Sequence, residues 1–207
     1  PPKKYKMIYD VRKMKSDLVK AVKQVEQEIQ DTFEIAFKDI YKDNMVPANF
    51  HSQKVKIIKK TIGSHSYLDG IPSRSGFYII LTNCPIEAND CSLKYRNLTA
   101  VYRGQASTAK KRLTSHLLNR QYNADYELRK EKYLKLKDLD AKFYEVHFGA
   151  CMKFHPEHNG INVSDLQYKD YQWVVIVHEM LDTTERVREL AELAFDSAFG
   201  KPIASRE

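Results

Sequence analysis

The chain has 207 residues, a net charge of +7 and a sequence isoelectric point near 9.1. This length supports one domain with a substantial core, and no stretch approaches the roughly 20 apolar residues that a membrane span requires. The basic balance modestly favours a polyanionic partner. The lysine-rich start lacks the apolar segment of a signal peptide, and three cysteines cannot all pair, so we expect a cytoplasmic protein with reduced thiols.

The first predicted element is an amphipathic helix over residues 16–42. Its apolar residues recur at spacings of three, four and seven, and its other face is charged. Such a stripe packs on the rest of the domain, or it forms an arm for dimerisation or DNA contact, and the sequence leaves both readings open. The stripe consists of Leu18, Val22, Val25, Ile29, Ala36 and Ile40.

Residues 44–75 combine prolines and glycines with many lysines, which predicts an ordered basic loop with a short strand candidate at Val55, Ile57 and Ile58. Solvation explains these charges as well as contact with a phosphate backbone does. The candidate phosphate contacts are Lys54, Lys56, Lys59, Lys60 and Arg74.

Two compact apolar strands are predicted at residues 76–82 and 98–102. Ser107 or Thr108 can then cap a helix that runs through Leu118, because either hydroxyl can accept a hydrogen bond from an early backbone amide. A charged helix is expected at 126–139, and strands are expected at 144–150 and 173–177.

Asp182, followed three residues later by Glu185, is typical of a helix N-cap with a reciprocal acidic residue, and it opens the last predicted helix. The elements together predict an α/β (α+β) fold, with a small mixed or antiparallel sheet flanked by helices. We expect residues 1–74 to form the helical arm and basic loop and residues 75–207 to form the nuclease-like core, the two together making one compact unit.

The chemistry-bearing residues fall in a defined order. Gly76–Phe77–Tyr78 and Tyr102–Arg103–Gly104 lie on the two apolar strands. Arg112 and His116 follow at an i, i+4 spacing, which projects both from one helix face. Glu192 comes on the last helix. Phosphodiester hydrolysis needs a positioned water, an acceptor for its proton and positive charge against the phosphate, and these residue types can supply them.

This order resembles the GIY-YIG nucleases, in which two strand motifs precede a helix with arginine and often histidine, and then a metal-binding glutamate. The resemblance spans residues 75–205 and implies that Glu192 binds one Mg²⁺, with Mn²⁺ able to substitute. It also implies that Arg112 contacts the scissile phosphate, and that Tyr78 engages the attacking water beside Tyr102 and His116. The identity of the base stays open, as does Glu189 in place of Glu192.

Three departures from the family pattern stand out. Phe77 and Arg103 replace branched apolar residues, and Arg103 is expected to leave the core, toward a phosphate that Lys110 and Lys111 also flank. The long segment between the two motifs suggests an elaborated hairpin loop, as in the restriction-enzyme branch. Ser205 stands at the place where the family has asparagine, so either the serine substitutes for it or the asparagine lies beyond the end of this sequence.

The sequence therefore predicts a metal-dependent endodeoxyribonuclease, most like a site-specific type II restriction enzyme that cuts double-stranded DNA as a homodimer. The alternatives are a structure-specific or mobile-element nuclease, a catalytically inactive nucleic-acid-binding module, and a purely structural interaction protein. A zinc site is a weaker hypothesis, because the spacings fit no tight signature. Its residues would be Cys84, Cys91, Cys151, His155 and His158.

Overall fold

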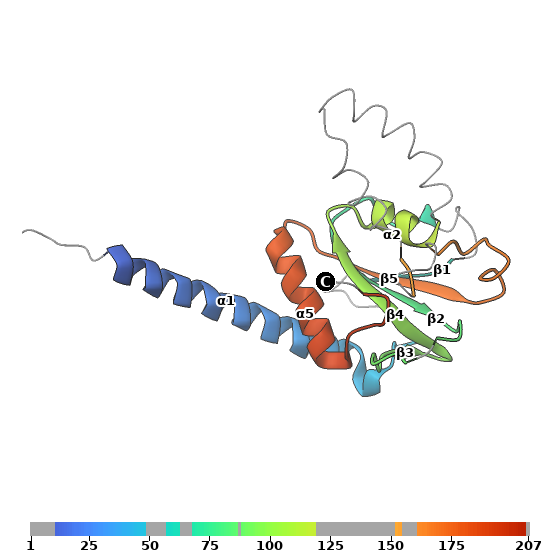
Figure 1. The fold of residues 1–207 in the computed structure, drawn as a ribbon, viewed down its shortest axis with the longest axis horizontal. Helices are drawn as coiled ribbons and strands as arrows, with labels where there is room; N and C mark the ends of the chain where they lie inside the picture. Colours follow the sequence, from blue (N-terminus) through green and yellow to red (C-terminus); the bar gives the residue numbers. More distant parts are fainter. Residues whose placement is uncertain are drawn as a thin grey trace, which may run out of the picture.

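The computed structural model describes residues 11–48, 57–62, 68–86, 88–118, 152–154 and 161–205, with side chains omitted at 11–13 and 57–60. The predicted elements at 126–139 and 144–150 lie outside these residues. So do Lys54, Lys56, Cys151, His155 and His158. Figure 1 shows a long helix leading into a sheet that carries helices on both sides.

The sheet has five strands in the order β1-β5-β2-β4-β3, and every neighbouring pair is antiparallel. β2, which contains the first motif, is the central strand, between β5 and β4, and it is buried along its whole length. The predicted α+β fold is thus confirmed. The strands are β1 (Ile57–Thr61), β2 (Gly76–Thr82), β3 (Lys94–Tyr95), β4 (Leu98–Ala106) and β5 (Trp173–Glu179).

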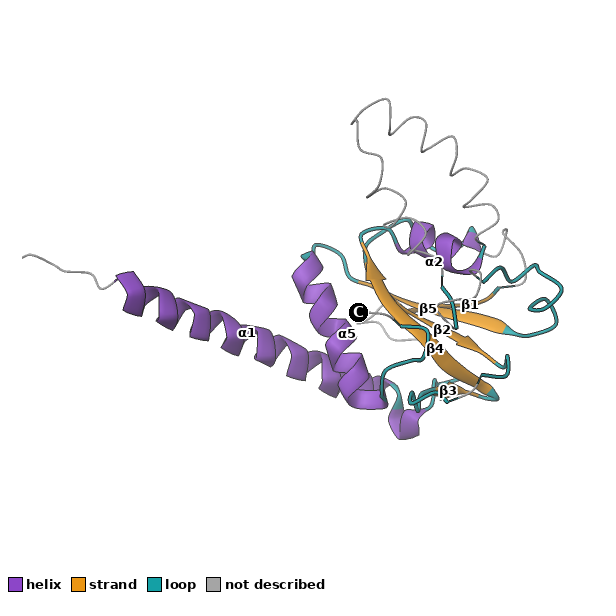
Figure 2. Ribbon diagram, viewed as in Figure 1, coloured by secondary structure: helices purple, strands orange, loops and turns teal. Residues whose placement is uncertain are grey.

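Helices cover both faces of this sheet (Figure 2). α1 (Val11–Ile40) and α5 (Glu185–Phe199) pack with one face, where Phe77 joins a core that includes Phe37 and Phe195. α2 (Ala109–Leu117) packs on the other, with Tyr78, Ile80 and Leu113. Since side chains alternate along a strand, neighbouring motif residues of β2 serve opposite cores.

A β-bulge in β4 changes this alternation just before the second motif. Tyr102 pairs with Ile80 but Ala100 pairs with Leu81, so Val101 is the extra residue. Val101 and Tyr102 consequently both belong to the α2 side. The bulge therefore brings Tyr102 to the face of Tyr78 and turns Arg103 toward α5.

The predicted N-terminal helix is present, and it starts earlier and ends two residues sooner than expected. Its stripe was only partly right, because Phe33 and Phe37 make the core contacts whereas Ala36 is exposed. The C-terminal half of α1 lies along α5, and the N-terminal half projects from the body (Figure 1). A short 3-10 turn, Lys42–Asn44, follows it.

The predicted helix caps needed correction. Thr108 is the N-cap of α2, but its side chain makes no capping hydrogen bond. Thr184, not Asp182, is the N-cap of α5, and its Oγ1 accepts a hydrogen bond from the backbone N of Val187 at 3.3 Å. Asp182 has a φ of +57°, a left-handed conformation that aspartate tolerates, so the turn continues past it before the helix begins. Across the part of the chain described here, no helix combines the length and apolarity that crossing a bilayer requires.

Candidate functional site

Tyr78, Tyr102 and His116 form one aromatic cluster between the sheet and α2. The Tyr78 hydroxyl lies 3.0 Å from Nε2 of His116. The two tyrosine rings stack at a centroid distance of 6.1 Å, and the Tyr102 and His116 rings lie 4.4 Å apart. Tyr78 and His116 are buried and Tyr102 is half-buried. Three of the five predicted catalytic residues thus meet at one place.

Arg112 completes the cluster on this side of the sheet. Its guanidinium hydrogen-bonds Tyr78 and acts electrostatically on both tyrosines. Since Arg112 lies one turn before His116 on α2, the helix delivers both side chains to the same tyrosine. Arg112 is half-buried, so it keeps access to solvent.

Burial raises the pKa of Tyr78 well above 10, the neighbouring Tyr102 raises it further, and Arg112 opposes the shift. Burial also raises the pKa of Tyr102, again against the influence of Arg112. Both phenols are therefore neutral at physiological pH. A neutral phenol can accept a proton from another group only if its own hydroxyl proton leaves at the same time. Nε2 of His116 lies where it could receive the hydroxyl proton of Tyr78.

The expectation that Arg103 leaves the core was wrong, because its side chain is buried against α5, and its contact with a phosphate stays a prediction. Its Nε and Nη2 lie 2.9 and 2.6 Å from the two carboxylate oxygens of Asp196, and its Nη1 lies 3.1 Å from Oε1 of Glu192. The bulge turns the side chain toward α5, where two carboxylates one turn apart meet it. Sequence analysis assigned no role to Asp196, although its i, i+4 spacing from Glu192 is visible in the sequence.

The Ser205 side chain hydrogen-bonds the backbone of Arg103. Its hydroxyl accepts a hydrogen bond from the Arg103 backbone N at 2.9 Å and donates to the Arg103 backbone O at 3.3 Å. The backbone N of Ala204 donates to the carbonyl of Val101 at 2.9 Å. The C-terminal segment therefore lies along β4, and the serine fastens it there.

Glu192 is the carboxylate best placed to hold a metal. Burial raises its pKa, and Arg103 opposes that shift. Its charge acts on Tyr78 and Tyr102, so it belongs to the same electrostatic environment. The ion pair uses Oε1, and within the described residues no hydrogen bond or ion pair uses Oε2. Glu189 is more exposed and already accepts a hydrogen bond from Arg186 at 3.1 Å.

The donor set suits a hard cation that keeps most of its water. Carboxylate oxygen is what Mg²⁺ prefers, and Mg²⁺ is commonly held by one or two carboxylates. Among the described side chains, no group of three or more His, Cys, Asp or Glu residues forms a ready-made cage. Asp196 is occupied by Arg103 in a two-oxygen contact. Glu192 alone therefore fits Mg²⁺ as a single protein ligand.

Basic residues gather at the start of α2. The carbonyl of Arg74 accepts a hydrogen bond from the Ala109 backbone N at 3.0 Å, which places Arg74 beside Lys110 and Lys111. Arg74 and Lys111 are exposed, whereas Lys110 pairs with Asp69 at 3.0 Å. Lys59 and Lys60 lie on edge strand β1, and the structure gives only their backbone.

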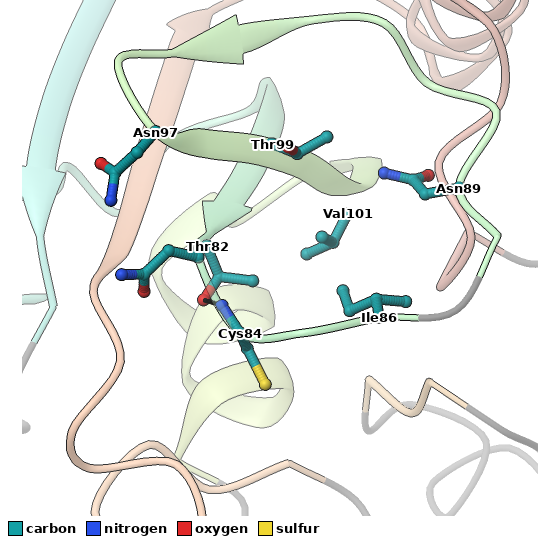
Figure 3. Close-up of a pocket in the computed structure, with 8 residues that line it drawn as sticks. Thr82, Cys84, Ile86, Asn89, Asn97, Thr99 and Val101 are labelled. Atoms are coloured by element: carbon teal, nitrogen blue, oxygen red, sulfur yellow. Dashed lines mark hydrogen bonds between the residues drawn. The ribbon is translucent and has the colours of Figure 1, made fainter.

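A separate pocket of about 170 Å³ lies at the far end of the β2–β4 pair (Figure 3). Burial raises the pKa of the Cys84 thiol that lines it, so this thiol is not a ready nucleophile. Cys91 lies in the opposite core, where burial raises its pKa to about 11. The two cysteines therefore do not form a zinc-binding pair. The other lining residues are Thr82, Asn83, Ile86, Asn89, Asn97, Thr99 and Val101.

Comparison of the chain with protein-family models, with curated proteins and with solved structures finds no match.

Proposed function

We propose that this protein is a metal-dependent DNA endonuclease of the GIY-YIG type that hydrolyses phosphodiester bonds in the cytoplasm. The observation that carries the proposal is the buried hydrogen bond between Tyr78 and His116, with Tyr102 and Arg112 against it. These residues come from β2, β4 and α2, so their meeting requires the fold. Residues with no common function would not be expected to meet in one buried cluster from three separate elements.

In this proposal each side chain has a separate role. Arg112 binds the scissile phosphate, because its guanidinium offers two parallel donors and stays charged. A divalent ion bound at Glu192 would supply positive charge to the phosphate and the leaving oxygen. The Tyr78 oxygen takes the proton of the attacking water as the Tyr78 proton passes to Nε2 of His116. Tyr102 stacks on both partners and holds their geometry.

The finer proposal is a type II restriction enzyme that cuts duplex DNA at a specific site. It is supported by the long β2–β4 connection, which carries β3 and lies beside Met45 after α1. Arg74 and Lys111, exposed at the start of α2, are the described candidates for phosphate contact.

A second candidate is a DNA-binding module without catalysis. The Arg103–Glu192 ion pair favours it, because this pair engages the one carboxylate proposed to hold the metal. Such a module would bind DNA through phosphates and release counterions, so its affinity would fall steeply with salt. It would give no metal-dependent product.

The test is incubation with mixed-sequence duplex DNA, with and without Mg²⁺, for the wild type, Tyr78→Phe, Arg112→Ala and Glu192→Ala. Glu189→Gln is the matched control, since it alters a carboxylate one turn away on the same helix. Discrete fragments that require Mg²⁺ and all three residues, but not Glu189, support a site-specific nuclease. Salt-sensitive binding without cleavage of linear, branched or single-stranded DNA supports the module instead.

A further inference from the structure

Arg188 is a buried cation on the inner face of α5. It is only 6% exposed, about as little as Arg103 at 7%. Buried arginines in proteins are almost always paired with an anion, because a guanidinium that leaves water without one is costly. Arg103 has its anions in Glu192 and Asp196. The charge of Arg188 therefore calls for an anion of its own.

The hydrogen bonds of Arg188 go only to neutral oxygens. Its Nε donates to Oε1 of Gln105 at 3.0 Å, and its Nη1 donates to the backbone O of Thr183 at 2.6 Å. Nη1 also lies 3.4 Å from Oγ1 of Thr183. Among the described residues, no carboxylate pairs with this guanidinium and no hydrogen bond uses Nη2. Nη2 is not fully buried, so an ion from solvent can reach it.

Gln105 supplies a second donor beside this nitrogen. Its Oε1 is taken by Arg188, and within the described part of the chain its Nε2 donates to no group. Gln105 is half-buried, so its amide also borders solvent. Because Nε and Nη2 form one edge of the planar guanidinium, Nη2 lies next to the Gln105 amide. The two side chains thus present neighbouring N–H groups.

These donors lie one turn from the carboxylate proposed to hold the metal. Arg188 precedes Glu192 by four residues on α5, a rise of about 6 Å. Gln105 and Arg103 are two residues apart on β4, so they share the strand face that meets α5. β4 and α5 lie side by side in Figure 1. A ligand that contacts Arg188 therefore lies beside Glu192.

We propose that Arg188 and Gln105 bind a phosphate group. A guanidinium provides charge and directed N–H donors, which suit the oxygens of a phosphate, and the amide adds a neutral donor. The net charge of +7 favours a polyanionic ligand as the source of that group. In the nuclease proposed above, the group is the phosphate next to the scissile one on the bound strand. Only this last assignment rests on the proposed function.

The first experiment titrates the chain with inorganic phosphate, against chloride at the same ionic strength, and follows the Tm. We expect phosphate to raise the Tm of the wild type, because it binds the folded state. Arg188→Gln should weaken the apparent affinity at least about tenfold, since a charge-assisted hydrogen bond is lost. Arg186→Gln is the matched control and should respond as the wild type does. Arg186 lies on the same helix but is exposed and already pairs with Glu26 and Glu189.

Gln105→Glu keeps the proposal testable if the loss of Arg188 harms folding. The new carboxylate takes the place of the amide that Arg188 contacts at 3.0 Å. Without phosphate the Tm should rise, because the buried cation gains an anion. Added phosphate should then lose its effect, because its place is taken. A phosphate response that persists in Gln105→Glu would put the anion elsewhere and overturn the proposal.

Binding of duplex DNA without Mg²⁺ identifies the source of the phosphate. Each phosphate contact contributes about 0.9 to the slope of log K against log salt. If Arg188 binds a backbone phosphate, Arg188→Gln should reduce this slope by about one contact, and Arg186→Gln should leave it unchanged. A purely structural role for Arg188 would alter the Tm but not the slope.

The two arms separate the possible outcomes. An unchanged slope, together with a response to inorganic phosphate that requires Arg188, would assign the site to a free phosphate or a nucleotide. If neither the phosphate response nor the slope depends on Arg188, the proposal is overturned. Neither arm measures cleavage, so absence of cleavage would count against the nuclease and leave the phosphate site standing.

Discussion

Gly104 lies against the ring of Tyr78 across the β2–β4 pair, so close that no side chain fits between them. A Cβ at position 104 would lie 2.6 Å from the Tyr78 hydroxyl oxygen, 2.7 Å from Cζ and 2.8 Å from Cε1 of Tyr102. The two residues are direct partners in the ladder. The glycine of the second motif therefore makes the space in which the two tyrosines stack.

Gly104→Ala should consequently displace Tyr78 from His116. Overpacking of this kind costs about 1–3 kcal/mol of stability. If the proposed chemistry is right, cleavage should fall about 100-fold, because displacement of about 1 Å is costly to a positioned catalytic group. Thermal unfolding and single-turnover cleavage measure the two effects, and DNA binding should be unchanged. A stable Gly104→Ala protein with full cleavage would contradict both the steric argument and the role of Tyr78.

The sequence was a good guide to which residues share a face wherever the backbone is regular. Arg112 and His116 lie one turn apart on α2, so their meeting on one face followed from helix periodicity, whereas Tyr102 reaches the face of Tyr78 only through the β-bulge in β4. The bulge at Val101 was not predicted, since one extra residue leaves no compositional sign. The bulge reversed the side of the sheet to which Arg103 points, and so the expectation that this side chain leaves the core was wrong.

The apolar stripe of α1 shows a second limit of prediction from sequence. Periodicity predicted a helix correctly, but it weighted aliphatic residues alone and so missed Phe33 and Phe37, whose rings reach the core. Which part of a long amphipathic helix packs internally depends on the length of its partner. α5 has 15 residues against 30 in α1, so among the described residues the first half of α1 has no helix packed along it.

Arg103→Met should be among the most damaging single substitutions. It leaves the carboxylates of Glu192 and Asp196 together, largely buried and without their cation, and loss of one partner of a buried ion pair costs about 3–5 kcal/mol. The cost should shrink as the pH falls, because burial raises the pKa of Glu192 and its protonation relieves the repulsion. Urea unfolding at several pH values measures it. Arg186→Met is the control, since its ion pairs are exposed and screened by solvent, so its loss of stability should be much smaller. Equal losses in both variants would refute the argument.

Glu192→Gln should separate stability from activity. Burial raises the pKa of Glu192, so the folded state disfavours its charged form and loses stability as the pH rises through the usual range of a carboxyl. The neutral amide removes that cost, and we expect an equal or higher Tm at pH 7 together with a loss of metal-dependent cleavage of at least about 100-fold. Glu189→Gln should change neither quantity appreciably. A marked fall in the Tm of Glu192→Gln would show that its ion pair with Arg103 outweighs its desolvation.

The acid stability of the fold should depend on His178. This side chain is buried among Phe37, Phe77 and Tyr41, and its Nε2 lies 2.6 Å from the Tyr41 hydroxyl. Burial lowers its pKa from 6.5 to about 3. Below pH 6.5 the unfolded chain therefore binds a proton at His178, whereas the folded protein does not bind it until the pH approaches 3. The stabilisation present above pH 6.5 is consequently lost as the pH falls toward 3.

From these two pKa values the free energy of unfolding should drop by about 2 kcal/mol between pH 7.5 and pH 5 through His178 alone. His178→Gln removes the titrating group and keeps a hydrogen-bonding partner for Tyr41, so its unfolding free energy should vary less over this range by about that amount. Urea unfolding at the two pH values provides the comparison. Tyr41→Phe should preserve the pH dependence while costing about 1–3 kcal/mol at every pH, since it leaves a buried ring nitrogen without its hydroxyl. The same pH dependence in His178→Gln as in the wild type would place the titrating group elsewhere.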